Sequence, residues 1–262
     1  MRCTGCGMQI FQEKGGECPY CGVPILIFKS EYMQQPFVQT EDCGADVFET
    51  SINSILEISC IGKFKMQNGN SERWTGSGFV VTDDGYAVTN AHVAANSQDG
   101  SPVEKMTVST CGQTIGAKVV ALADKKAGKE TGVDLALIKL DKMPFRCKAL
   151  QIENYKMVRN GEQIYVIGNS LGQGTCITSG VVSDRDREGR LMYDCPTNPG
   201  NSGGPVINAK GKVIGVHFSG QRAPLQDITG RDVIASVKAQ GMNYAIPSDV
   251  LLAFLKKTIN YK

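Results

Sequence analysis

The chain has 262 residues, and a hydrophobic content of 41% is enough for a packed core in one large all-β domain or in two smaller domains. The formal net charge is +2 and the charged residues are scattered, which argues against the basic stripe that nucleic-acid binding needs. The N-terminus lacks the apolar stretch of a secretory signal and no later apolar run is long enough to cross a bilayer, so we expect a soluble, cytoplasmic protein with neither nucleic-acid nor membrane partners.

Two Cys-x-x-Cys pairs, each followed by glycine, lie in the first 22 residues. Cys3 and Cys6 form the first pair, and Cys18 and Cys21 form the second. Two residues between cysteines let both thiolates reach one ion from a tight turn, and two such pairs supply four sulfur ligands for a closed tetrahedral zinc site. A redox-active Cys-x-x-Cys is the alternative, but that motif occurs singly in front of a helix.

We therefore predict a zinc ribbon over residues 1–25, with one structural zinc ion. A closed site with four sulfur ligands has no open position for substrate or water, so this metal is expected to hold the module together and not to take part in catalysis. The ribbon is more plausible as a surface that docks to a partner.

Residues 26–45 show no sustained helical or alternating period and are interpreted as a linker. This leaves residues 46–262 for one further domain. That region has short runs rich in Val, Ile, Thr and Tyr punctuated by glycine, and residues 78–89 are predicted to form a β-hairpin. At the C-terminus, Val250, Leu251, Phe254 and Leu255 follow helical spacing, so a terminal helix closes an all-β sandwich or barrel. Further strands are predicted at 118–122, 135–140, 163–167, 176–182, 205–207, 213–216 and 242–246.

Three segments carry residue types that suit nucleophilic catalysis. His92 follows a predicted strand, Asp134 opens another, and Ser202 lies in a glycine-rich loop. A serine hydroxyl needs an imidazole to take its proton, and the imidazole needs a carboxylate to fix its tautomer. Gly200 lets the loop expose its backbone, so that the N–H groups of Gly200 and Ser202 can both point at an oxyanion. The order His, Asp, Ser is that of the chymotrypsin class and the reverse of that in α/β-hydrolases.

Residues of about 50 to 258 resemble trypsin-like peptidases of the HtrA-type and glutamyl-endopeptidase branch. The matching motifs are Thr89-Asn90-Ala91-His92, Asp134-Leu135-Ala136-Leu137, Gly200-Asn201-Ser202-Gly203-Gly204-Pro205 and Tyr244-Ala245-Ile246-Pro247. The resemblance implies the chymotrypsin fold, with two six-stranded antiparallel β-barrels, of which the first supplies His92 and Asp134 and the second Ser202. It also implies a serine endopeptidase that acts on protein or peptide substrates without a catalytic cofactor.

Two departures from related enzymes bear on control of activity. The chain ends soon after its predicted terminal helix, so no PDZ domain is expected. Trypsin-type zymogens pair a newly freed N-terminus with an aspartate directly before the catalytic serine, and here Asn201 stands at that position. We therefore expect activity without N-terminal cleavage.

A second histidine, His217, lies in a strand that follows the nucleophile loop and, by resemblance, forms a wall of the primary specificity pocket together with Ser219 and Gly220. In glutamyl endopeptidases a Gly-x-His at this place donates a hydrogen bond to the substrate carboxylate, and a threonine or serine stands near five residues before the nucleophile, as Thr197 does here. Cleavage after glutamate is therefore expected. Glutamine is the runner-up, because related viral proteases read an amide with a similar pair, and a small apolar residue is a further alternative.

Two other interpretations compete with this one. The chain could be a catalytically silent binding protein that uses the zinc ribbon, although an intact triad argues against it. The remaining cysteines could form a redox switch, but small buried apolar residues are the simpler role. They are Cys43, Cys60, Cys111, Cys147, Cys176 and Cys195.

Overall fold

The structure is a computed structural model that describes residues 16–17, 24–25, 43–65, 70–96, 99–123, 133–226 and 232–261. By its contacts the chain divides into two units, Met1–Asp42 and Cys43–Lys262. In the first unit β1 (Gly16–Glu17) pairs antiparallel with β2 (Pro24–Ile25), so these short strands flank the sequence that holds the second Cys-x-x-Cys pair. The second unit opens with α1 (Cys43–Ser51), which begins inside the segment expected to be a linker.

Six strands close the first barrel of the second unit, in the order β3-β4-β5-β8-β7-β6. The predicted hairpin is confirmed, because β4 pairs antiparallel with β5 and places Phe79 opposite Val88. Gly85 in its turn has a φ of +94°, a conformation that favours glycine. The interior is apolar and includes Leu56, Ile58 and Ile138. The strands are β3 (Ile55–Lys65), β4 (Ser71–Val80), β5 (Tyr86–Thr89), β6 (Lys105–Thr110), β7 (Gln113–Leu122) and β8 (Ala136–Leu140).

Six further strands close the second barrel, in the order β10-β11-β14-β13-β12-β9. Its interior holds Val166, Val182, Leu191 and Ile214, and the side chain of Tyr193 is also fully buried there. The prediction of two closed six-stranded antiparallel barrels is therefore confirmed. The strands are β9 (Gln163–Asn169), β10 (Thr175–Arg187), β11 (Arg190–Tyr193), β12 (Pro205–Asn208), β13 (Val213–Gln226) and β14 (Asp232–Pro247).

A third apolar cluster joins the outer faces of both barrels. It combines Phe79 and Leu137 of the first barrel with Ile167 and Ile207 of the second. The predicted terminal helix, α3 (Ser248–Ile259), packs Leu251 and Leu255 into this cluster, and α1 adds Val47. Shared burial of this kind holds the two barrels against each other. No helix among the described residues is long and apolar enough to span a membrane.

Short helical segments connect the strands. The helix that follows β5, α2 (Ala91–Ala94), is the one that carries His92. The others are the 3-10 turns η2 (Ile52–Ser54), η3 (Tyr155–Met157) and η4 (Ser170–Gly172).

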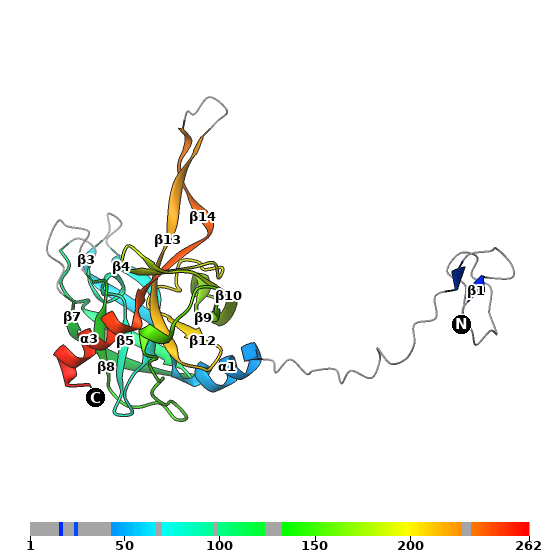
Figure 1. Cartoon of the computed structure of the whole chain (residues 1–262). Coiled ribbons are helices and arrows are strands. Elements are labelled where there is room, and N and C mark those ends of the chain that lie inside the picture. The colour runs from blue at the N-terminus through cyan, green and yellow to red at the C-terminus, as the bar shows by residue number, and fades with distance from the viewer. Residues whose placement is uncertain are drawn as a thin grey trace. The chain divides into compact units, whose positions relative to one another are not determined.

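Strands β13 and β14 continue beyond the barrel as a two-stranded ribbon, which projects from the protein in Figure 1. β12 pairs with β13 only as far as Val216, and β11 pairs with β14 only from Asn243 onward. The register shifts between Gly220 and Arg222, as at a β-bulge, where the ribbon leaves the barrel. The sequence pattern predicted strands only to residue 216 and from residue 242, so the ribbon was not foreseen.

Candidate active site

His92 and Asp134 lie side by side because the strands next to them are paired. β5 and β8 run antiparallel with Thr89 opposite Ala136, which brings the end of β5 to the start of β8. The His92 Nδ1 atom is 2.5 Å from Asp134 Oδ2, and the His92 backbone N–H donates to Asp134 Oδ1 at 2.9 Å. Asn90 Nδ2 donates to the Asp134 carbonyl at 2.8 Å. Both carboxylate oxygens therefore orient His92, whose side chain is 43% exposed and can meet a substrate.

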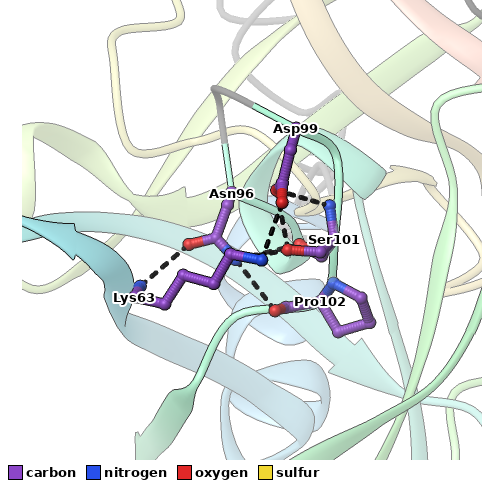
Figure 2. Close-up of polar contacts among 5 residues, drawn as sticks. All are labelled: Lys63, Asn96, Asp99, Ser101 and Pro102. Carbon is purple, nitrogen blue, oxygen red and sulfur yellow. Dashed lines mark hydrogen bonds and ion pairs between the residues drawn. The ribbon is translucent and has the colours of Figure 1, made fainter.

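The loop after α2 is tied to β3 by a buried asparagine, as Figure 2 shows. Asn96 is 1% exposed, and its Nδ2 donates to the carbonyls of Ser101 and Pro102 at 3.1 and 2.9 Å. Its Oδ1 accepts from the Lys63 backbone N–H at 3.1 Å. Asp99 accepts from Lys63 Nζ at 2.7 Å, and this contact together with those from Ser101 lowers the pKa of its carboxyl to about 2. These contacts join Asn96 and Asp99, which follow α2, to Lys63 of β3.

The helix that carries His92 is also fixed from β3 and β4. The carbonyl of Val93 accepts hydrogen bonds from Trp74 Nε1 at 2.9 Å and from Cys60 Sγ at 3.2 Å. A Cβ atom at Gly76 would lie 2.6 Å from Val93 Cγ1 and 3.3 Å from the Ser202 carbonyl. Only glycine leaves enough room at this position of β4. Val93 of the first barrel and Ser202 of the second therefore both lie close to Gly76.

Ser202 lies in a loop whose glycines are required by its backbone. Gly200 has a φ of +99°, and a Cβ atom there would lie 2.1 Å from the Asn169 carbonyl oxygen. Gly203 has a φ of +87°, and its Cβ would lie 2.2 Å from the Ser77 carbonyl oxygen. Neither the Gly200 nor the Ser202 amide has a hydrogen-bond acceptor among the described residues. Both N–H groups are therefore available to the oxyanion for which the sequence proposed them.

Ser77 of β4 joins the nucleophile loop to the first barrel, and sequence reasoning missed it. Its backbone N–H donates to the Ser202 carbonyl at 2.8 Å, and its Oγ donates to the Gly200 carbonyl at 2.7 Å. The same Oγ accepts from the Asn169 N–H at 2.8 Å, and Thr89 Oγ1 donates to the Ser77 carbonyl at 2.7 Å. The signal in the sequence was a small polar residue between two glycines, Gly76-Ser77-Gly78.

The two residues expected to read the substrate side chain are buried and hydrogen-bonded. His217 is 3% exposed, and its Nδ1 lies 2.6 Å from the hydroxyl of Tyr193. Thr197 is 5% exposed, and its Oγ1 donates to Asn243 Oδ1 at 2.7 Å. Asn243 in turn donates from Nδ2 to the Cys195 carbonyl at 2.8 Å. Tyr193 and Asn243 were not foreseen, because they reach these positions only through strand pairing.

The strand that carries His217 also connects to the nucleophile loop. The Gly203 N–H donates to the His217 carbonyl at 2.8 Å, and the His217 N–H donates to the Gly204 carbonyl at 2.9 Å. Ser219 and Gly220 follow on β13, opposite Tyr244 and Asn243 of β14.

Comparison with known proteins agrees with this geometry. Residues 76–216 match the family model described as "Trypsin-like peptidase domain". The chain belongs to the trypsin-like peptidase family. Serine protease HTRA1A of Danio rerio is 30% identical over 269 residues, which cover 91% of this chain and 50% of that protein. A probable periplasmic serine endoprotease DegP-like of Rhizobium meliloti is 36% identical over 153 residues, covering 55% of this chain and 28% of the relative.

Solved structures of an HtrA-type protease and of another serine endoprotease share the fold. AlgW with a decapeptide superimposes with a TM-score of 0.64 at 21% identity, covering 83% of this chain and 67% of that one. A serine endoprotease from Yersinia pestis gives a TM-score of 0.60 at 24% identity, covering 82% of this chain and 66% of that one. This trypsin-like peptidase spans about half the length of the HTRA1 relatives that it matches.

The predicted zinc ligands of this trypsin-like peptidase, Cys3, Cys6, Cys18 and Cys21, lie outside the described residues. Within the described ranges, no group of three or more His, Cys, Asp or Glu side chains could hold a metal ion.

The free cysteines of the barrels differ in exposure. Cys60 and Cys195 are buried, and burial raises the pKa of each thiol to about 12. Cys147 is also buried, with a pKa raised to about 11 mainly by burial, whereas Cys111 is exposed. The expected role of a small buried residue therefore suits Cys60, Cys147 and Cys195 but not Cys111.

Proposed function

We propose that this protein is a serine endopeptidase in which Ser202 is the nucleophile, His92 the general base and Asp134 the residue that orients His92. The observation that carries the proposal is the double contact between Asp134 and His92, next to a Ser202 loop held by Ser77. The relatives named as serine proteases support the reaction class, and the AlgW structures with a decapeptide and a tripeptide support a peptide substrate.

The geometry assigns a role to each group in the reaction. Asp134 holds the Nδ1 side of the imidazole, so Nε2 takes the proton of Ser202 Oγ as this oxygen attacks the scissile carbonyl carbon. The carbonyl oxygen becomes an oxyanion and accepts from the N–H groups of Gly200 and Ser202. The imidazolium then protonates the leaving amine. In the second step His92 takes a proton from a water molecule that attacks the acyl-enzyme, and it gives this proton to Ser202 Oγ as the acid product leaves.

For the residue before the cut, we propose a side chain that ends in a carbonyl-type oxygen. His217 is buried on the strand that bonds to the nucleophile loop, and it supplies a hydrogen-bond donor for that oxygen. Glutamate, expected from the resemblance to glutamyl endopeptidases, and glutamine both satisfy this requirement.

We further propose that residues 1–25 form a zinc ribbon that docks to a partner protein. The support is the pair of Cys-x-x-Cys motifs and the antiparallel β1–β2 pair on either side of the second motif. The cytoplasmic location also stays a prediction.

The proposed activity is tested with a fluorophosphonate probe and a peptide library on the full chain and on Ser202→Ala. A fluorophosphonate labels only an activated serine, so we expect labelling and cleavage with the wild type and neither with Ser202→Ala. Absence of labelling in folded wild type would favour a silent binding protein instead. Cleavage retained by purified Ser202→Ala would remove Ser202 from the nucleophile role.

A further inference from the structure

A groove of about 400 Å³ lies over strands β3, β4 and β6 of the first barrel. Strand pairing places two rows of side chains along it, one with a cation at each end and one made only of hydroxyls. The rows are Arg73, Ile61 and Lys105, followed by Thr75, Ser59 and Thr107. Side chains alternate along a strand, and the barrel interior receives Cys60 and Met106, so both rows lie on the outer face. This surface is called the basic groove below.

The polar side chains of the basic groove have no partners within the described part of the chain. Arg73 and Lys105 are exposed, and neither forms a hydrogen bond or an ion pair with a described residue. The hydroxyls of Ser59, Thr75 and Thr107 likewise have no described hydrogen-bond partner. The groove therefore offers two positive charges and three hydroxyl groups to a ligand.

Nearby carboxylates do not cancel this positive charge. No Asp or Glu is among the described residues that line the groove, although Glu72 and Glu104 precede the two cations in sequence. Glu57 comes next on β3 beyond the hydroxyl row, and its Oε1 accepts from Thr175 Oγ1 of the second barrel at 2.9 Å. At the other end of the groove, Asp99 is paired with Lys63 at 2.7 Å (Figure 2).

Strand β4 connects the basic groove to the candidate active site. Arg73, Thr75 and Ser77 share one face of β4, and the Ser77 N–H donates to the Ser202 carbonyl at 2.8 Å. Ser77 and Arg73 are four residues apart, a distance of about 14 Å that about four residues of an extended peptide would span. The groove is therefore within reach of a substrate bound at Ser202.

The proposed reaction indicates which part of the substrate lies over β4. The leaving amine takes its proton from His92, so the residues that follow the cut begin beside this side chain. The helix of His92 is held by β4, since Trp74 Nε1 donates to the Val93 carbonyl at 2.9 Å. On its other side the nucleophile loop bonds to β13 through Gly203. The chain that follows the cut is thus directed along β4 toward the groove.

We propose that the basic groove binds an acidic segment of the substrate that begins about four residues after the cut. This inference rests on the proposed function. Arg73 and Lys105 lie on either side of Ile61, with backbones about 10 Å apart, and their long side chains can each meet a carboxylate of the segment. The half-buried Ile61 excludes water between the two ion pairs, which strengthens the attraction. The hydroxyls of the second row donate to further oxygens of the segment.

Binding is measured on the full chain with Ser202→Ala, which does not consume the peptide. Fluorescence anisotropy compares a labelled glutamate-rich peptide with the same peptide in which glutamine replaces every glutamate. We expect the glutamate peptide to bind about tenfold more tightly, since exposed ion pairs are individually weak. Most of this advantage should disappear between about 50 and about 300 mM NaCl.

Substitutions locate the binding to the groove. Arg73→Gln and Lys105→Gln should each weaken binding of the glutamate peptide by about threefold, and together by about tenfold. Lys118→Gln combined with Lys142→Gln is the matched control, because both lysines are exposed, lie outside the groove and change the net charge equally. This control should bind like the parent chain. Arg73→Glu combined with Lys105→Glu should instead prefer a lysine-rich peptide.

Cleavage kinetics place the groove relative to the cut. A substrate selected from the peptide library is extended with glutamates either after or before the scissile bond. We expect an about tenfold lower KM at unchanged kcat only when the glutamates follow the cut, and loss of this gain in the double glutamine variant of Arg73 and Lys105.

The outcomes separate this inference from the proposed function. Equal binding of the glutamate and glutamine peptides overturns the acidic-segment site, and so does equal weakening by the control pair of lysines. A gain from glutamates placed before the cut, or tighter binding of a single-stranded oligonucleotide than of the peptide, also overturns it. In each case fluorophosphonate labelling of Ser202 would keep the peptidase, whereas absence of labelling would remove the proposed function.

Discussion

Ser77→Ala tests whether contact between the barrels shapes the nucleophile loop. The substitution deletes one buried oxygen that donates to the Gly200 carbonyl and accepts from the Asn169 N–H. Ser77 is fully buried, so water cannot replace these bonds without rearrangement. Its backbone N–H, which donates to the Ser202 carbonyl, is unaffected.

The expected magnitudes follow from these two bonds. A buried hydrogen bond contributes about 1 kcal/mol, and a buried group left unsatisfied costs about 1–3 kcal/mol, so we expect the free energy of unfolding to fall by about 2–3 kcal/mol. Gly200 loses the restraint on its carbonyl, so its backbone angles are less well fixed and its N–H, which lies in the preceding peptide plane, is aimed less well at the oxyanion. Loss of a whole oxyanion-hole donor costs about 10²–10³ in kcat, so a misaligned one should cost about tenfold to a hundredfold. Urea unfolding gives the first quantity, and kcat on a peptide substrate gives the second.

Ser248→Ala is the matched control for Ser77→Ala. Ser248 is also fully buried, and its Oγ donates to the Glu153 carbonyl at 2.9 Å, at the start of α3. We expect a loss of about 1 kcal/mol in unfolding free energy and an unchanged kcat. If Ser77→Ala lowers stability but leaves kcat at the wild-type value, the idea that Ser77 shapes the oxyanion hole is wrong.

Three further predictions concern other parts of the chain. Elemental analysis of protein purified without chelator should find one zinc ion per chain, and Cys3→Ser should abolish it; a metal-free wild type would contradict the ribbon. Iodoacetamide at pH 8 should label exposed Cys111 well before Cys60 and Cys195, because burial raises the pKa of both to about 12 and leaves little thiolate; equal rates by peptide mass spectrometry would refute this. The full chain should cleave peptides without trimming, because Asn201 gives a new N-terminus no carboxylate to pair with; activation only after removal of N-terminal residues would refute it.

Local sequence signals predicted much of the fold. Alternating strands, glycine turns and the apolar spacing after Pro247 placed the hairpin, the later strands and α3 correctly. The prediction failed where charged residues or a mixed composition obscured the regular spacing of apolar residues. α1 has a mixed sequence and was expected to lie partly in a linker, and β10 continues past Val182 through four charged residues to Arg187. These charged residues are tolerated because the end of β10 pairs with β11 and leaves most of its side chains near solvent.

The residues that support the candidate site could not be predicted from the sequence, for a different reason. Ser77 and Gly200 are 123 positions apart, and Thr197 and Asn243 are 46 positions apart. The spacing within a motif identifies residues that share one loop. It does not say which residues of two distant strands lie opposite each other. Tyr193 meets His217 only because β11 and β13 both pair with β14, which no local pattern specifies.

The ribbon makes β13 a strand with two very different local stabilities. At its base, Gly215 and Val216 are paired with β12 on one side and β14 on the other, and Val216 is fully buried, so their amides exchange with solvent only when the second barrel unfolds. Beyond Gly220 the strand pairs only with β14 among the described residues, and a lone two-stranded hairpin is marginally stable in water. Hydrogen exchange should therefore accelerate along one continuous strand, with His217 close to the point where protection begins to fall.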